Sequence, residues 1–190
     1  MDFTFKNSVS LSKGKVLISN PLLEEDYFTR SVILIVQHDE SGTLGFVLNN
    51  TISESLKQID PELPLHSLPI SIGGPMEKSN LFIIHRESPI FSDSKHINEN
   101  LFFGGNFKEL KERYQLQKDP HTVRYFLGYS GWSKTQLQEE IDENAWIVCE
   151  NIPIESFFNP KIEDFWKYAM ELQGVKFKRM INFPLNPSYN

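Results

Sequence analysis

The sequence of residues 31–48, SVILIVQHDESGTLGFVL, decides the fold class. Residues 31–37 are almost continuously apolar and rich in β-branched side chains, which is typical of a strand buried on both faces. Residues 39–42, Asp-Glu-Ser-Gly, form a turn cluster, and residues 43–48 are apolar again. We therefore expect an antiparallel hairpin whose strands belong to the core of a sheet.

Other short apolar runs, bounded by glycine, proline or polar residues, indicate further strands. They lie at residues 15–20, 70–72, 81–85, 101–103, 123–127 and 145–149. Residues 61–69 hold three prolines and should be a loop, and residues 87–100 should be strand or irregular backbone.

Capping signals predict where the helices begin. A Thr51/Glu54 capping box predicts a helix to about Ile59, and another helix should begin at Asn106. Ser133 and Gln136 form a second capping box. The last long helix should begin at Asn159-Pro160 and end at Gly174, with Phe165, Trp166 and Ala169 facing the core and Lys161, Asp164 and Lys167 in water.

The length of 190 residues indicates one domain over residues 1–190, and the predicted strands and helices make it a mixed α/β domain.

The net charge of −6 argues against direct nucleic-acid binding, since the basic residues cluster only briefly at Lys176, Lys178 and Arg179. The single cysteine, Cys149, lies in an apolar strand and is expected to be a buried, inert thiol. The N-terminus shows no signal peptide, and the longest apolar run, residues 32–36, is too short to cross a membrane, so a cytoplasmic location is expected.

Two glycine-rich segments are candidates for chemistry. Gly128-Tyr129-Ser130-Gly131-Trp132 lacks the residue between serine and the second glycine that a nucleophile elbow needs, so a tight strand-to-helix turn is the expected structure. Gly73-Gly74-Pro75 could form an anion-binding nest of backbone N–H groups or a plain turn.

None of the five histidines has the spacing of zinc ligands, so we expect no metal site. His38 and His85 each end an apolar strand and could reach a site or only mark strand ends. Glu139, Glu140, Asp142 and Glu143 crowd one helix; a solvated acidic face is expected rather than acid–base chemistry.

The chain resembles the YqgE/AlgH family through motifs that cover most of its length in order. They are Gly14–Ile18, Asn20-Pro21, Phe28, Ser31-Val32, His38-Asp39, Gly45–Asn49, Gly73–Pro75, Leu81–His85, Gly104-Gly105, Gly128–Trp132, Gln136-Leu137, Glu140, Asn144, Trp146 and Phe183–Ser188. Thr51, Ser130 and Thr135 depart from the residues usual in that family. The resemblance implies a compact α/β fold with a bifurcated, partly barrel-like mixed sheet flanked by helices.

The resemblance implies no agreed reaction and no cofactor, although some family members are named as transcriptional regulators. The function we expect is therefore a non-enzymatic binding or regulatory protein. It would act on a protein partner or a small acidic ligand through the glycine-rich loops, and any transcriptional effect would be indirect. The alternative is an enzyme with His38 or His85 as general base.

Two strand-helix-strand units suggest where a ligand would bind. If both crossovers join parallel strands, Gly104 and Gly128 end their strands at one sheet edge, where the following helices begin. The expected pocket for a small anion is bordered by Gly104, Gly105, Asn106, Gly131, Trp132 and Ser133. Asn106 and Ser133 could instead only cap their helices. His38 and Asn49, at opposite ends of the hairpin, should not share a site.

Overall fold

The predicted hairpin forms the middle of the sheet. In the computed structural model, β2 (Val32–Asp39) pairs antiparallel with β3 (Gly42–Val47), and Ile33 lies opposite Val47. A bulge between Ile35 and Gln37 shifts the register near the turn. Ile33 and Ile35 pack on one face of the sheet, whereas Val32, Leu34 and Val36 pack on the other. The first hairpin strand is therefore buried on both faces, as its apolar run predicts.

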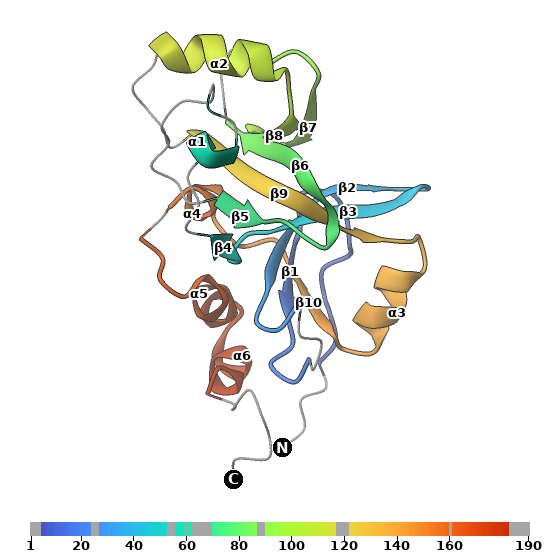
Figure 1. Cartoon of the computed structure of the whole chain (residues 1–190). Helices are drawn as coiled ribbons and strands as arrows, with labels where there is room; N and C mark the ends of the chain where they lie inside the picture. The colour runs from blue at the N-terminus through green and yellow to red at the C-terminus, as the bar shows by residue number, and fades with distance from the viewer. Residues whose placement is uncertain are drawn as a thin grey trace.

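The structure describes residues 5–23, 27–52, 56–59, 61, 70–86, 90–116, 122–159 and 161–182. Within these residues, ten strands form one sheet with the order β10-β1-β2-β3-β9-β6-β8-β7, and β4 and β5 lie off this path (Figure 1). The remaining strands are β1 (Val16–Ser19), β4 (Thr51–Ile52), β5 (Ile70–Ile72), β6 (Met76–His85), β7 (Ser94–Asn98), β8 (Leu101–Gly104), β9 (Val123–Trp132) and β10 (Trp146–Cys149).

The sheet is bifurcated at β9. One end of β9, Ser130–Trp132, pairs antiparallel with β3, and Phe126 and Leu127 pair in parallel with β5. The chain that leaves β3 continues into β4, which pairs antiparallel with the other edge of β5. Strand β5 is thus wedged between β9 and the β3–β4 segment, and the sheet does not close into a barrel.

The glycines of the fork have little room for a side chain. A Cβ on Gly74 would lie 2.0 Å from the carbonyl carbon of Tyr129, and one on Gly73 would lie 2.4 Å from the Gly128 oxygen. Gly128 itself has a φ of +68°. The tight turn expected at residues 128–132 is wrong, because these residues continue β9; the positive φ of Gly128 lets the backbone bend there without ending the strand.

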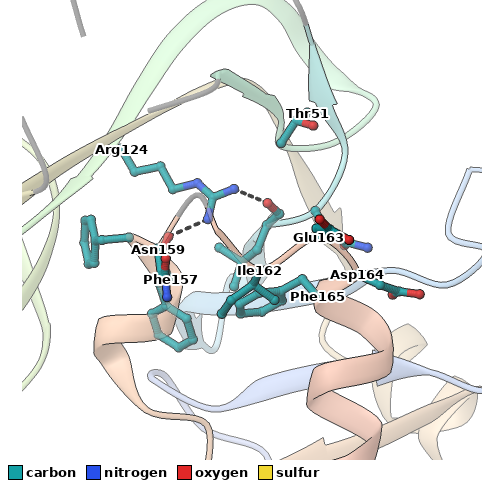
Figure 2. Close-up of a pocket in the computed structure, with 11 residues that line it drawn as sticks. Thr51, Arg124, Phe157, Asn159, Ile162, Glu163, Asp164 and Phe165 are labelled. Carbon is teal, nitrogen blue, oxygen red and sulfur yellow. Dashed lines mark hydrogen bonds between the residues drawn. The ribbon is translucent and has the colours of Figure 1, made fainter. Parts of the chain in front are cut away.

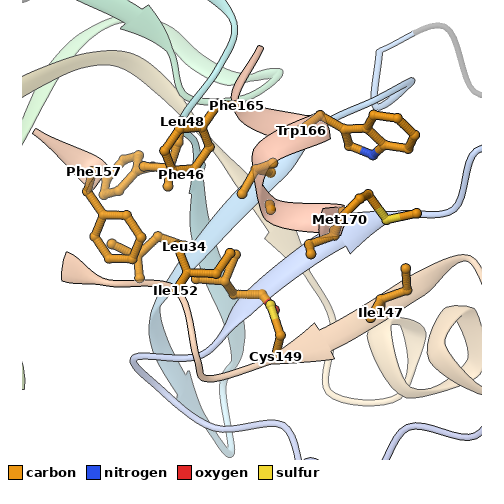
Figure 3. Packing of buried hydrophobic residues seen from close by; sticks show 14 of the residues in the cluster. Leu34, Phe46, Leu48, Ile147, Cys149, Ile152, Phe157, Phe165, Trp166 and Met170 are labelled. Atoms are coloured by element: carbon orange, nitrogen blue, oxygen red, sulfur yellow. The ribbon is translucent and has the colours of Figure 1, made fainter. Parts of the chain in front are cut away.

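The helices cover both faces of the sheet. On one face, α3 (Gln136–Asp142) packs Leu137 and Ile141 onto the isoleucines of β2. On the other face, α4 (Ile154–Phe157) and α5 (Phe165–Leu172) contribute Phe157, Phe165 and Trp166 to the largest core cluster (Figure 3). Helix α6 (Val175–Met180) follows α5, and α2 (Phe107–Leu116) covers the outer part of the sheet near β8.

Two predicted helix starts differ from the structure. Thr51 lies in β4, so it does not cap α1 (Leu56–Ile59); residues 53–55, with the predicted Glu54 partner, are outside the described residues. Helix α5 begins at Phe165 and not at Asn159-Pro160, because Asp164 caps it by accepting a hydrogen bond from the Lys167 amide. Asn159 accepts instead from the amide of Lys161, which is a local turn.

Other expectations concern segments at the edges of the described structure. The proline-rich loop at residues 62–69 and the motif at residues 183–188 lie outside the described residues. The short basic cluster of Lys176, Lys178 and Arg179 belongs to α6, where all three residues are exposed. Because Gly174 has a φ of +99°, the chain can leave α5 and begin α6 directly.

Trp166 should be a major contributor to stability. Trp166 is 1% exposed within the cluster of Figure 3, and its Nε1 donates to the Ser19 carbonyl at 3.0 Å. Lys161, Asp164 and Lys167 are exposed, as predicted. Trp166→Ala should lower the free energy of unfolding by about 3–5 kcal/mol, and Lys167→Ala by less than about 0.5 kcal/mol. Urea unfolding measures both values; similar values for the two variants would contradict the assignment.

The fork predicts that alanine at Gly74 destabilises the protein more than alanine at Gly131. Gly74→Ala should cost about 3 kcal/mol or more, since the backbone of β9 would have to move. Gly131→Ala is the control: its Cβ would meet side chains and no backbone, the ring of Tyr129 at 3.3 Å and Met76 Cγ at 3.8 Å, so the cost should stay near 1 kcal/mol or less. Equal melting temperatures for the two variants would refute the close approach.

Candidate ligand-binding site

The structure separates the two groups of residues that were expected to border one pocket. Strand β6 pairs antiparallel with both β8 and β9, so these two strands do run parallel. Ile84 of β6 lies opposite Phe103 on one side and Arg124 on the other, which places Gly104 close to the start of β9. Gly131 is seven residues beyond Arg124, about 20 Å along the strand. The two groups therefore do not border one pocket, and α2 and α3 begin far apart (Figure 1).

Two of these residues, Asn106 and Ser133, have structural partners at the start of a helix. The Oδ1 of Asn106 accepts from the amides of Lys108 and Glu109, at 2.9 and 3.3 Å, which caps α2. Ser133 and Gln136 exchange two hydrogen bonds at the start of α3, as their capping-box pattern predicts. These contacts explain Asn106 as the cap of α2 and Ser133 as a partner of Gln136 in the turn before α3, whose N-cap is Thr135. A direct ligand contact by Gly104, Gly105, Asn106, Gly131, Trp132 or Ser133 stays a prediction.

Glu140 has a role that its helix pattern did not reveal. Its Oε2 accepts from the indole N–H groups of Trp132, at 2.9 Å, and Trp146, at 2.7 Å. Phe28 stacks on Trp132 within the same cluster. The expected solvated acidic face is therefore wrong for Glu140, whose carboxylate joins α3 to the ends of β9 and β10.

The other motif residues are divided among separate places. His38 bonds to Thr43 Oγ1 beside the hairpin turn, at 2.8 Å. At the opposite end, Asn49 accepts from the Val32 amide and donates to the Arg30 carbonyl. The expectation that His38 and Asn49 do not share a site is confirmed.

Gly73 is part of the sheet and not of an open nest. Its N–H donates to the Leu127 carbonyl, and its own carbonyl accepts from the Val47 amide and from Ser130 Oγ. Pro75 is exposed and has no N–H to offer an anion. The Gly73–Pro75 motif is thus explained by the fork.

His85 and Cys149 are both buried in the core. Burial lowers the pKa of His85 to about 4, while its hydrogen bond to the Gly104 backbone opposes the shift. Its Nε2 bonds to Ser94 Oγ at 2.8 Å, and its ring stacks on Phe102. Cys149 is buried, as predicted, and burial raises the pKa of its thiol to about 12, which disfavours the reactive thiolate at neutral pH.

A cavity of about 380 Å³ opens where the sheet forks (Figure 2). Its walls come from the end of β3, from β9, and from the segment that joins α4 to α5. Residues lining it are Leu48, Asn49, Thr51, Arg124, Phe157, Phe158, Asn159, Ile162, Glu163, Asp164 and Phe165. The volume is in the range of small-molecule pockets, and aromatic and aliphatic side chains form much of the wall.

Arg124 is the distinctive group of this cavity. It is only 7% exposed, yet it is a cation inside an otherwise apolar strand. Its guanidinium donates to the carbonyls of Leu48 and Phe157 (Figure 2). It also donates to Ser71 Oγ, at 2.8 Å. It thereby joins β9 to both branches of the fork and to the last residue of α4.

The charge of Arg124 has no carboxylate partner within the described residues. Its three hydrogen bonds use neutral oxygens, and its Nε has no hydrogen-bond partner there. Burial lowers the pKa of the guanidinium to about 10, so it remains charged at pH 7. A buried cation without a counter-ion favours a bound anion beside it.

The sequence signal for Arg124 was present in Val-Arg-Tyr-Phe-Leu, residues 123–127. Arginine is rarely buried unless it is paired, so a lone arginine within an apolar strand marks a special position. What could not be read from the sequence is that β3, β5 and α4 converge on this side chain.

No group of three or more histidine, cysteine or acidic residues that could hold a metal occurs in the described part of the chain. Among the helices of that part, none is long and apolar enough to span a bilayer.

The buried His85 predicts a loss of stability on mild acidification. Its folded pKa lies below the unfolded value near 6.5, so the unfolded chain binds the proton more tightly and stability falls as pH drops through 6.5 toward 4. Between pH 7 and 5 the loss should be about 1–2 kcal/mol. His85→Leu should reduce this slope in urea unfolding, and His96→Leu, at an exposed position, should keep it. An unchanged slope in His85→Leu would refute the neutral buried histidine.

The sequence of the chain matches a family model and several relatives over most of its length. The family model described as AlgH-like matches residues 16–178. A UPF0301 protein of Parabacteroides distasonis is 39% identical over 190 residues, covering 97% of this chain and 94% of the relative. One of Cytophaga hutchinsonii is 36% identical over 184 residues, covering 95% of this chain and all of the relative.

Solved structures share the fold. The crystal structure of protein DIP2367 from Corynebacterium diphtheriae has a TM-score of 0.80 at 23% identity and covers 94% of this chain and 95% of its own. The solution structure of the AlgH protein from Pseudomonas aeruginosa has a TM-score of 0.71, also at 23% identity, with 94% and 98% covered. The chain therefore belongs to the AlgH-like, or YqgE/AlgH, family.

Proposed function

We propose that the protein is a non-enzymatic binding protein that takes a small acidic ligand in the Arg124 cavity. The single observation that carries the proposal is the uncompensated charge of Arg124 in the wall of a cavity of about 380 Å³. An anionic group beside Arg124 would supply the missing counter-charge in a place where water screens it weakly. The proposal keeps the ligand class expected from the sequence and moves it from the glycine-rich segments to the fork.

A regulatory role in the cytoplasm is part of the proposal. The supporting feature is the position of the cavity, because Arg124 links β9, β5, the end of β3 and α4. A ligand that neutralises Arg124 would tighten these elements together and could change the surface offered to a protein partner. The whole chain, residues 1–190, would act as one binding domain, without direct contact to nucleic acid.

The geometry gives less support to an enzyme that uses a histidine as general base. A general base must reach the proton that it removes. His85 is fully buried, and its low pKa makes it a weak base. His38 lies at the hairpin turn and bonds to the Thr43 hydroxyl rather than to a carboxylate.

The proposed function predicts that charge decides binding. Calorimetric titration with 4-ethylbenzoate should give a dissociation constant at least about tenfold lower than titration with the neutral isostere 4-ethylbenzamide, since one charge-assisted contact is worth roughly 1.4 kcal/mol or more. Arg124→Lys keeps the cation and should therefore keep the preference for the acid over the amide. Arg124→Gln removes the cation and should abolish this preference.

The paired ligands control for folding, because they can be compared on the unaltered protein. Lys167→Gln changes an exposed charge on α5 outside the cavity lining and should leave the preference unchanged. Equal affinities for acid and amide, or no binding of the acid at millimolar concentration, would reject the proposal.

A further inference from the structure

The Arg124 cavity has charges of opposite sign on different walls. Arg124 projects from β9, whereas Glu163 and Asp164 come from the segment that leads into α5. In the view of Figure 2, Arg124 lies on the left and the two acidic side chains lie on the right. Ile162 and Phe165 lie between Arg124 and the acidic residues. A ligand in this cavity would therefore meet a cation at one end and carboxylates at the other.

The two carboxylates differ in their availability. The Oδ1 of Asp164 accepts from the Lys167 amide at 2.9 Å and so serves as the cap of α5. Glu163 is exposed and makes no ion pair or hydrogen bond with another described residue. Glu163 is thus the acidic group of the cavity wall whose charge is free to meet a ligand.

Apolar side chains form part of the cavity wall, beside the polar Asn49, Thr51 and Asn159. Leu48, Phe157 and Phe165 are buried core residues that also line the cavity, and Ile162 is half-buried beside them. These surfaces suit a hydrocarbon or aromatic body. A purely anionic ligand would satisfy Arg124 but would be repelled by Glu163.

We propose that the ligand is a small zwitterion, with a carboxylate directed to Arg124, an ammonium directed to Glu163 and an apolar body between them. The inference rests on the proposed function and narrows its ligand class from an acidic molecule to one that carries both charges. Amino acids with separated charged groups and short apolar peptides belong to this class. Electrostatic complementarity at both ends would then select against simple carboxylic acids and simple amines.

A matched series of rigid ligands tests the inference on the full-length protein. The probes are 4-(aminomethyl)benzoate, which carries both charges, 4-ethylbenzoate, which carries only the acid, and 4-methylbenzylamine, which carries only the amine. The zwitterion should bind about fivefold tighter than 4-ethylbenzoate, since pairs with an exposed carboxylate reach roughly that factor. The amine should bind more weakly than either.

Glu163→Gln should act on the probes with opposite signs. It should weaken 4-(aminomethyl)benzoate about fivefold and tighten 4-ethylbenzoate about twofold, because the attraction and the repulsion are both removed. Glu171→Gln, at an exposed position of α5 outside the cavity lining, should change neither affinity. Both substitutions lie on the surface and should fold normally.

The outcomes separate this inference from the proposed function. If 4-ethylbenzoate binds as tightly as the zwitterion, and Glu163→Gln shifts both in the same direction, the zwitterion is rejected and the acidic-ligand site stands. If neither 4-(aminomethyl)benzoate nor 4-ethylbenzoate binds, although the unaltered protein and the Glu163→Gln variant are both folded, the inference and the proposed function are both rejected.

Discussion

The close contact between Gly73-Gly74 and the backbone of β9 is the constraint on which the rest of the structure depends. The two backbones approach so closely that no Cβ fits at Gly74. This contact brings β5 to the edge of β9 that β3 has left, and the hydrogen bonds from the Gly73 N–H and carbonyl hold β9, β5 and β3 together. Gly73 and Gly74, which the sequence offered as a possible anion-binding nest, are therefore structural: they let β3 and β5 share one edge of β9, which ordinary side chains at these two positions would not allow.

Where a sheet forks, some backbone carbonyls lose their partner on a neighbouring strand, and a space opens between the two branches. Arg124 occupies part of that space and donates to the Leu48 carbonyl on one branch and to Ser71 on the other. Bonds to neutral oxygens satisfy donors but do not cancel the charge, so burial of this cation is favourable only in part. The same residue is thus a structural link and a candidate anion receptor, and the cavity beside it has two acidic side chains in its wall at Glu163 and Asp164.

Much of the fold could be predicted from local patterns, and the site could not. The run at residues 31–37 predicted a strand buried on both faces, and Ser133/Gln136 and Asn106 predicted helix starts, because these signals act over a few residues. The turn predicted at residues 128–132 is wrong, since a glycine with a positive φ inside a long strand, here Gly128, gives the same sequence pattern as a turn. Asn159-Pro160 is a good local cap, but Asp164 starts the helix. The cavity requires segments that are remote in sequence to converge, and no local pattern encodes that.

The central claim is that the fork builds a cavity in which the charge of Arg124 receives a ligand carboxylate. A crystal structure of the full chain with saturating 4-(aminomethyl)benzoate tests it most directly. The account predicts the carboxylate within hydrogen-bond distance of the Arg124 guanidinium, about 3 Å, with the ring against Phe157 or Phe165. A ligand bound elsewhere, or a reversed ligand with its carboxylate away from Arg124, would contradict it.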